Sequence, residues 1–164
     1  FLVLVPRHFE RGKAVGEELD ALGVKFVYRS ELLASSQFKP GEVDCLLVNT
    51  TGELKYFYEH ASLIFVGKSL TAEGGQNPIE PGALGKAMVF GPNMQNFASI
   101  AAAFVAHNGA AQVRDSTELE KVISELLADA PRRAELGRNA LKVVQENQGA
   151  VERTADLIVK RLTG

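Results

Sequence analysis

The chain has 164 residues, 46% of them apolar and 23% charged, which fits one compact domain rather than a disordered or fibrous segment. Its 18 Lys and Arg against 20 Asp and Glu leave a formal net charge of −2, without the basic footprint of a nucleic-acid-binding protein. The longest apolar runs fall well short of the roughly 20 residues that a membrane span needs. A single cysteine, Cys45, excludes an internal disulfide framework and a multi-thiolate metal site.

Six short apolar runs alternate with helical patterns up to residue 113. This alternation predicts an α/β fold, a doubly wound parallel six-stranded Rossmann-like sheet with helices on both faces. The expected strands are residues 1–5, 24–28, 44–48, 63–66, 87–90 and 111–113. The first run reads as a fully buried parallel strand already under way, so we expect the chain to be a piece of a longer protein.

The connections between and after these strands carry helical periodicity. Val15, Leu19 and Leu22 recur at helical spacing between the first two strands. After the sixth strand, Asp115 and Glu118 predict a capping box at the start of a helix. Its expected apolar stripe is formed by Leu119, Val122, Ile123, Leu126 and Leu127.

Two further helices complete the predicted tail. Pro131 opens a helix that ends near Asn147, and Gly149 separates it from a last helix over residues 150–162. The apolar stripe of this last helix needs a partner surface. If part of that surface is missing from this chain, the helix should be among its more mobile elements or should pack against a neighbouring copy.

The loops after the first and fourth strands are the expected ligand site. In a doubly wound sheet of spatial order 3-2-1-4-5-6, ligands bind beyond the carboxyl ends of these two strands. Residues 6–11 and 67–80 should therefore face each other. In the first loop, Arg7 offers a fork of donors that suits a phosphate, and His8 is a titratable donor beside it. Taken without the fold, the pair also fits a solvated surface.

The second of these loops combines glycines with a helix start. Backbone amides around Gly74 and Gly75, and at the helix that follows, can cradle a phosphate. Ser69 adds a hydroxyl donor, and Glu80 can accept two hydrogen bonds from ribose hydroxyls. Taken alone, Gly74-Gly75 also fits a plain turn, and Glu80 a carboxylate that merely stabilises a helix end.

A third loop, after the third strand, offers Thr50 or Thr51 as a helix cap and Gly52 for close backbone approach, and capping alone would explain it. The run Gly67-Lys68-Ser69 is not a P-loop, because Ser62 stands where that motif requires glycine.

The sequence predicts neither a cofactor nor a metal site. The first strand-to-helix turn lacks G-x-G-x-x-G, so no nicotinamide or flavin dinucleotide is expected. The three histidines, His8, His60 and His107, are scattered along the chain, so no metal constellation is expected either.

Five linked motifs resemble the carboxyl-terminal half of the Kdo transferases, GT-B glycosyltransferases that move 3-deoxy-D-manno-octulosonic acid (Kdo) from CMP-Kdo to a lipid A precursor. In order, they are Pro6-Arg7-His8-Phe9-Glu10-Arg11, Thr51-Gly52-Glu53-Leu54 with Tyr58, Phe65-Val66-Gly67-x-Ser69-Leu70, Gly74-Gly75-Gln76-Asn77-Pro78-x-Glu80-Pro81, and Gly91-Pro92 with Asn96-Phe97. Two positions depart from the family pattern: Asn49 replaces an expected aspartate, and Gln76 a frequent histidine.

The resemblance implies that this chain is the donor-binding half of a two-domain enzyme at the cytoplasmic face of the bacterial inner membrane. The amino-terminal domain would hold the lipid A precursor, the catalytic base and the membrane contact. No residue of this chain would be catalytic beyond leaving-group stabilisation by Arg7. The implied CMP-Kdo contacts are Pro6, Arg7, His8, Thr51, Gly52, Ser69, Gly74, Gly75, Asn77 and Glu80.

Two alternatives remain open from the sequence. One is another GT-B protein, a UDP-sugar transferase or epimerase, against which Pro6-Arg7-His8 and Gly91-Pro92 argue. The other is a non-catalytic nucleotide-binding module.

Overall fold

The computed structural model describes residues 1–147, and the chain divides into two compact units, Phe1–Phe57 and Tyr58–Gly164. Each unit has its own parallel three-stranded sheet. The helix expected over residues 150–162 lies outside the described residues. Within residues 1–147, no helix combines the length and the apolar character that crossing a bilayer would require.

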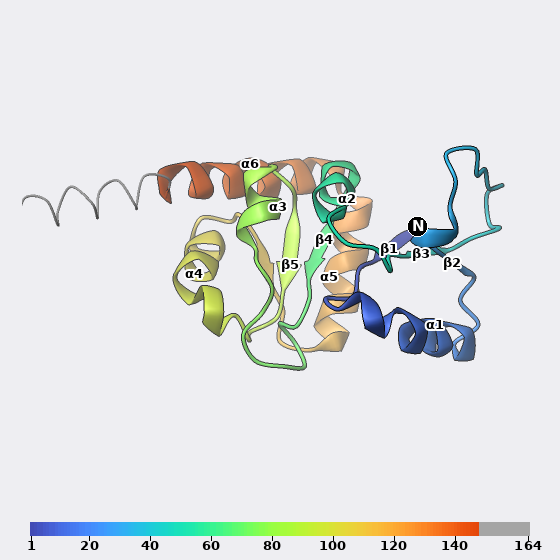
Figure 1. Ribbon diagram of the computed structural model, residues 1–164. Helices are drawn as coiled ribbons and strands as arrows, with labels where there is room; N and C mark the ends of the chain where they lie inside the picture. The colour runs from blue at the N-terminus through green and yellow to red at the C-terminus, as the bar shows by residue number, and fades with distance from the viewer. Residues whose placement is uncertain (148–164) are drawn as a thin grey trace, which may run out of the picture. The chain divides into compact units, whose positions relative to one another are not determined.

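The first unit is built on the short strands β1, β2 and β3 and the helix α1 (Figure 1). Its elements are β1 (Leu2–Leu4), the 3-10 turn η1 (Phe9–Arg11), α1 (Gly12–Ala21), β2 (Phe26–Tyr28), the 3-10 turn η2 (Arg29–Glu31) and β3 (Cys45–Leu47). The helix α2 (Leu54–His60) begins in this unit and ends in the next.

The strand β3 lies in the middle of the first sheet and pairs in parallel with β1 and β2. Cys45 is in register with Leu2 on one side and with Phe26 on the other. The expected order, with the second strand in the middle, is therefore wrong for this unit. All three residues of β3 are buried, so the most apolar of the three strands takes the position with neighbours on both sides.

The expectation that residues 1–5 form a fully buried strand is also wrong. The strand exists as β1, but Phe1 is 85% and Leu2 is 52% exposed. Among the described residues, β1 is an edge strand that pairs with β3 alone, and its apolar side chains are therefore covered less than those of β3.

The core of the first unit lies between α1 and the sheet. Leu19 from the helix and Cys45 and Leu47 from β3 are buried there. A Cβ atom on Gly16 would lie 2.1 Å from the hydroxyl oxygen of Tyr28, so the missing side chain lets α1 approach β2 closely. Leu22, expected on the apolar face, follows the last residue of α1 and is 76% exposed.

The second unit has the strand order β4-β5-β6, again parallel throughout. Figure 1 shows β4 beside the central strand β5. These strands are β4 (Ile64–Val66), β5 (Met88–Phe90) and β6 (Ala111–Gln112). All six strands predicted from the sequence are therefore present, and the α/β class with parallel strands is confirmed. Among the described residues, hydrogen bonds pair the six strands as two groups of three.

The helices of the second unit surround a larger core. They are α3 (Ile79–Ala83), α4 (Ala98–Ala106) after the 3-10 turn η3 (Gln95–Phe97), α5 (Ser116–Ala128) and α6 (Ala130–Asn147). The helix α6 packs against α3, α4 and α5 (Figure 1). A Cβ atom on Gly137 of α6 would lie 2.0 Å from the carbonyl oxygen of Gly85, so α6 rests directly on the turn after α3.

The predicted cap of α5 is present with one change of partner. The Asp115 carboxylate accepts a hydrogen bond from the backbone N–H of Glu118 at 2.8 Å, as a helix cap should. The Glu118 carboxylate, however, accepts from the backbone N–H of Arg114 rather than from that of Asp115. In the predicted stripe of α5, Leu126 is fully buried, whereas Leu127 is 57% exposed and does not belong to the buried face.

Candidate functional site

The loop after β1 brings the expected residues Pro6, Arg7 and His8 together at the carboxyl edge of the first sheet. They border a hollow of about 300 Å³. Its lining residues are Leu4, Pro6, Arg7, His8, Arg11, Val15 and Glu18. The backbone N–H of Arg11 donates to the carbonyl oxygen of His8 at 3.0 Å and closes the loop. Two guanidinium groups against one carboxylate make this hollow suitable for an anionic group.

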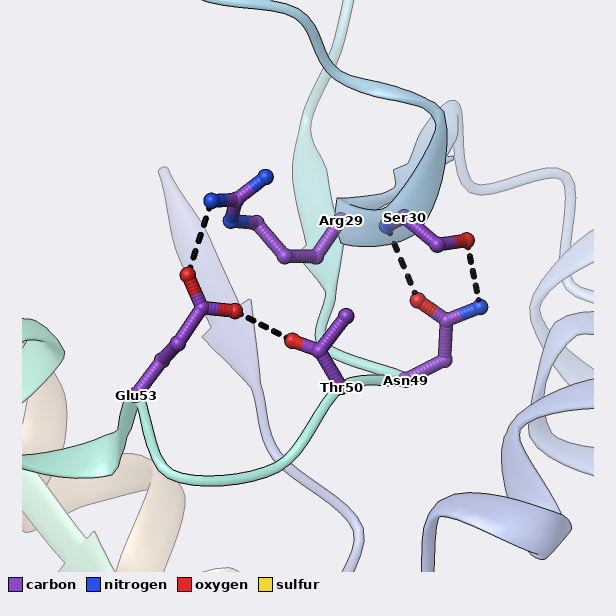
Figure 2. Close-up of polar contacts among 5 residues, drawn as sticks. All are labelled: Arg29, Ser30, Asn49, Thr50 and Glu53. Carbon is purple, nitrogen blue, oxygen red and sulfur yellow. Dashed lines mark hydrogen bonds and ion pairs between the residues drawn. The ribbon is translucent and has the colours of Figure 1, made fainter.

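The ends of β2 and β3 are tied together at the same edge by two polar connections (Figure 2). Arg29 forms an ion pair with Glu53, with 2.7 Å between Nη2 and Oε1. The Asn49 side chain pairs twice with Ser30: its Oδ1 accepts from the backbone N–H at 3.0 Å, and its Nδ2 donates to Oγ at 2.8 Å. This reciprocal pairing uses both the donor and the acceptor of an amide, which gives Asn49 a structural role at this position.

The carboxylate of Glu53 organises the loop that follows β3. The Thr50 hydroxyl donates to it, and this bond together with Arg29 holds the pKa of Glu53 below its ordinary value, although partial burial acts in the opposite direction. Thr51 and Gly52 are exposed between these anchors, and Gly52 has a φ of +82°. Thr50 and Glu53 thus fix the loop that presents the expected contacts Thr51 and Gly52.

The Ser69 hydroxyl is not free to contact a ligand. Ser69 is fully buried, its Oγ donates to the carbonyl oxygen of Val66 at 2.6 Å and accepts from the backbone N–H of Gly91 at 2.8 Å. Both hydrogen-bonding functions of the hydroxyl are therefore used inside the protein. Ser69 fastens the loop after β4 to the loop after β5, and the expected direct donor role is replaced by a positioning role.

Gly74 and Gly75 are held against the 93–96 segment in conformations that favour glycine. Their φ values are +103° and +63°. A Cβ atom on Gly75 would lie 2.5 Å from the sulfur of Met94. The Gly74 N–H donates to Oε1 of Gln95 at 2.8 Å and is not available to a phosphate. Both glycines are buried, and among residues 1–147 the backbone N–H of Gly75 has no hydrogen-bond partner, so it is the one of the two glycine amides that the protein leaves unpaired.

Asn77 and Glu80 meet at the start of α3. The Asn77 Oδ1 accepts from the backbone N–H of Ile79, and its Nδ2 donates to Oε1 of Glu80, both at 2.9 Å. Glu80 is exposed and makes no capping bond to the helix backbone in the described part of the chain. Its carboxylate is close enough to Tyr58 to add to the effect of burial, and together they raise the pKa of the Tyr58 hydroxyl.

The expected residues gather in two groups, one in each unit. Pro6, Arg7, His8, Thr51 and Gly52 lie at the carboxyl edge of the first sheet, and the others follow β4 in the second unit. That the two loops face each other stays a prediction. Within residues 1–147, no three His, Cys, Asp or Glu side chains gather as metal ligands would.

Sequence reasoning missed the residues that hold these loops in place. They are Arg29, Ser30, Gln95 and Asn93. Arg29 and Ser30 come at the end of a strand, which was a signal available in the sequence. The bond from Gln95 to Gly74 joins residues 21 positions apart, and no local pattern indicates it.

Comparison with known proteins gives a consistent result. The chain is 33% identical over 158 residues to the 3-deoxy-D-manno-octulosonic acid transferase of Haemophilus influenzae and 32% identical over 158 residues to that of Bordetella pertussis. These matches cover 96% of this chain and 36% of each relative, so the chain spans about a third of the length of the relatives. No protein-family model matches the chain.

A solved structure agrees with this result. The chain is similar to the crystal structure of the C-terminal CMP-Kdo binding domain of WaaA from Acinetobacter baumannii, with a TM-score of 0.78 and 30% identity. The match covers 87% of this chain and 72% of that domain. The chain therefore belongs to the 3-deoxy-D-manno-octulosonic acid transferase family, and it corresponds to the carboxyl-terminal domain of that family.

Proposed function

We propose that this chain binds CMP-Kdo and is the donor-binding part of a glycosyltransferase that moves Kdo to a lipid A precursor. The observation that carries the proposal is the similarity, at a TM-score of 0.78 over 87% of the chain, to a domain whose description names CMP-Kdo binding. The proposal includes two partners, an amino-terminal acceptor domain and the lipid A precursor. It also includes a location at the cytoplasmic face of the inner membrane.

The contacts proposed for the nucleotide come from both units. From the first unit they are Pro6, Arg7, His8, Thr51 and Gly52. From the second they are Gly74, Gly75, Asn77 and Glu80, with Ser69 as a positioning residue. Glu80 keeps its Oε2 for a ribose hydroxyl while Asn77 holds Oε1. The Arg7 guanidinium is exposed beside an arginine-rich hollow and suits a phosphate oxygen.

The proposed reaction is an inverting displacement at the anomeric carbon of Kdo. An acceptor hydroxyl forms the new C–O bond, the bond to the phosphate oxygen of CMP breaks, and the electron pair leaves with CMP. The proton of the hydroxyl goes to a base in the amino-terminal domain. Negative charge develops on the departing phosphate, so Arg7 and the free amide of Gly75 would act by stabilising this leaving group.

A binding panel tests the proposal. Titration of the 164-residue chain with CMP, UMP, GMP and ADP should give the highest affinity for CMP, and backbone NMR shifts should move in the loops 6–11 and 67–80. The chain alone should transfer no Kdo, because the base and the acceptor site would lie in the other domain. Equal binding of the four nucleotides, or shifts that avoid both loops, would favour another GT-B enzyme.

A further inference from the structure

The backbone of Lys68 has a conformation that is common for glycine and rare for lysine. Its φ is +59°, a left-handed conformation that is unfavourable for a non-glycine residue. Within residues 1–147, Asn108 is the other non-glycine residue with positive φ, at 51°. Asn108 follows the end of α4, where asparagine commonly adopts this conformation. Lys68 lies in the turn directly after β4, where a residue with positive φ is ordinarily glycine or asparagine.

Hydrogen bonds on both sides fix this conformation. The carbonyl oxygen of Gly67 accepts from the backbone N–H of Gln76 at 3.1 Å, and that of Ser69 accepts from the N–H of Asn93 at 2.9 Å. The buried Ser69 hydroxyl adds two more bonds. The surrounding loop therefore holds the Lys68 backbone in place and leaves its side chain exposed directly after the carboxyl end of β4.

The Lys68 ammonium is also unpaired at the carboxyl edge of the second sheet, within the described part of the chain. Between residues 62 and 113, the sequence contains two basic residues of the Lys and Arg type, Lys68 and Lys86. The Lys86 ammonium donates to the carbonyl oxygens of Glu59 and Ala61, before β4. Arg114, after β6, is paired with Glu118 at 2.9 Å. Among the described residues, Lys68 forms no ion pair and no side-chain hydrogen bond.

We propose that Lys68 is a phosphate-binding residue of the donor site and that its exposed ammonium binds the phosphate of the sugar nucleotide. This inference rests on the proposed donor-binding function. Among residues 62–113, Lys68 is the one Lys or Arg whose side chain forms no ion pair or hydrogen bond within the described part of the chain, and it stands where glycine would adopt the same backbone without strain. Glycine there would fold better and bind the anion less well.

The experiment compares four variants of the 164-residue chain by calorimetric titration and thermal unfolding. Lys68→Gly should raise the melting temperature by about 2 °C, since it removes the strain, and should weaken CMP binding about threefold to tenfold. Lys68→Gln should weaken CMP binding equally while keeping the strain. Lys68→Arg should retain most of the affinity, and Lys121→Gln on the exposed face of α5 is the matched control.

Cytidine, which lacks the phosphate, separates the two explanations. Its affinity should be the same for the wild-type chain and Lys68→Gln. If the wild-type chain binds CMP and Lys68→Gly binds it equally well, the role of Lys68 is wrong and the donor-binding function stands. If Lys68→Gln weakens cytidine as much as CMP, the lysine acts through the loop structure, which also overturns the proposal. If the wild-type chain binds no CMP, both proposals fail.

Discussion

The hydroxyl of Ser69 accepts a hydrogen bond from the backbone N–H of Gly91 at 2.8 Å, and both residues are buried. A Cβ atom on Gly91 would lie 2.2 Å from the carbonyl oxygen of Ser69, so the two backbones touch. The loops that follow β4 and β5 are thus joined at their bases. This junction fixes the positions of Lys68 and of the loop that carries Gly74 and Gly75.

Ser69→Ala should destabilise the chain by about 1 to 3 kcal/mol, because it leaves the buried N–H of Gly91 without a partner. Chemical unfolding of the wild-type chain and the variant measures this loss. Ser36→Ala, which alters an exposed hydroxyl that accepts from Leu33, is the control. An unchanged free energy of unfolding would show that water replaces the hydroxyl and that the junction is not structural.

Gly75→Ala should lower stability by about 1 to 3 kcal/mol, because the backbone is left-handed there and the added methyl group meets Met94. Gly67→Ala is the matched control in the same loop, since a Cβ atom there has nothing within 4 Å and Gly67 has no positive φ. Thermal unfolding of both variants distinguishes the positions. Equal melting temperatures would mean that the loop rearranges at little cost.

Arg7→Ala should weaken CMP binding by about 1.5 to 3 kcal/mol if Arg7 makes a charge-assisted bond to the phosphate. Arg7→Lys should recover part of the loss, since it restores the charge but not the planar fork. Arg138→Ala, an exposed change on α6, is the control. An affinity unaffected by Arg7→Ala would return Arg7 to the solvated-surface interpretation.

Glu80→Gln should weaken CMP binding about threefold to tenfold through lost acceptance from the ribose hydroxyls, with little change in melting temperature. The variant should bind 2′,3′-dideoxy-CMP as the wild-type chain does, because that nucleotide has no hydroxyl to lose. A large drop in melting temperature would instead support a role for Glu80 in stabilising the start of α3.

The stability of the first unit should depend on pH through Glu53. The pKa of this carboxyl is lowered from 4.5 in the folded chain, so its contribution is fully present above pH 4.5 and is lost as the pH falls through the folded pKa. Denaturant midpoints of the wild-type chain and Glu53→Gln, measured from pH 7 downward, should converge at low pH. Glu17→Gln, an exposed change on α1, should run parallel to the wild-type curve.

The sequence predicted the strands better than their arrangement. Apolar runs locate all six strands because burial of a strand needs such a run. The position of β3 between β1 and β2 depends on which of the three short strands has a neighbouring strand on each side. The period of the apolar residues does not reveal this order. Similarly, the residue type of Ser69 suggested a ligand donor, whereas its burial between Val66 and Gly91 is a property of the folded chain.

Residue chemistry predicted more of the site than backbone geometry did. Arg7 and His8 share one loop because they are adjacent in sequence, and Asn77 meets Glu80 across three positions. The left-handed conformation of Lys68 could not be predicted, since lysine rarely adopts it and the bonds that impose it come from Gln76 and Asn93.

The single cysteine, Cys45, is a chemical probe for opening of the first unit. Cys45 is fully buried in the central strand β3, and burial raises the pKa of its thiol, so an alkylating reagent reaches it only when that strand is released. The rate at which the thiol is alkylated then reports how often the first unit opens, and not how often the second unit does. A nucleotide anchored by Arg7 would slow that rate, whereas a nucleotide held solely by the second unit would leave it unchanged.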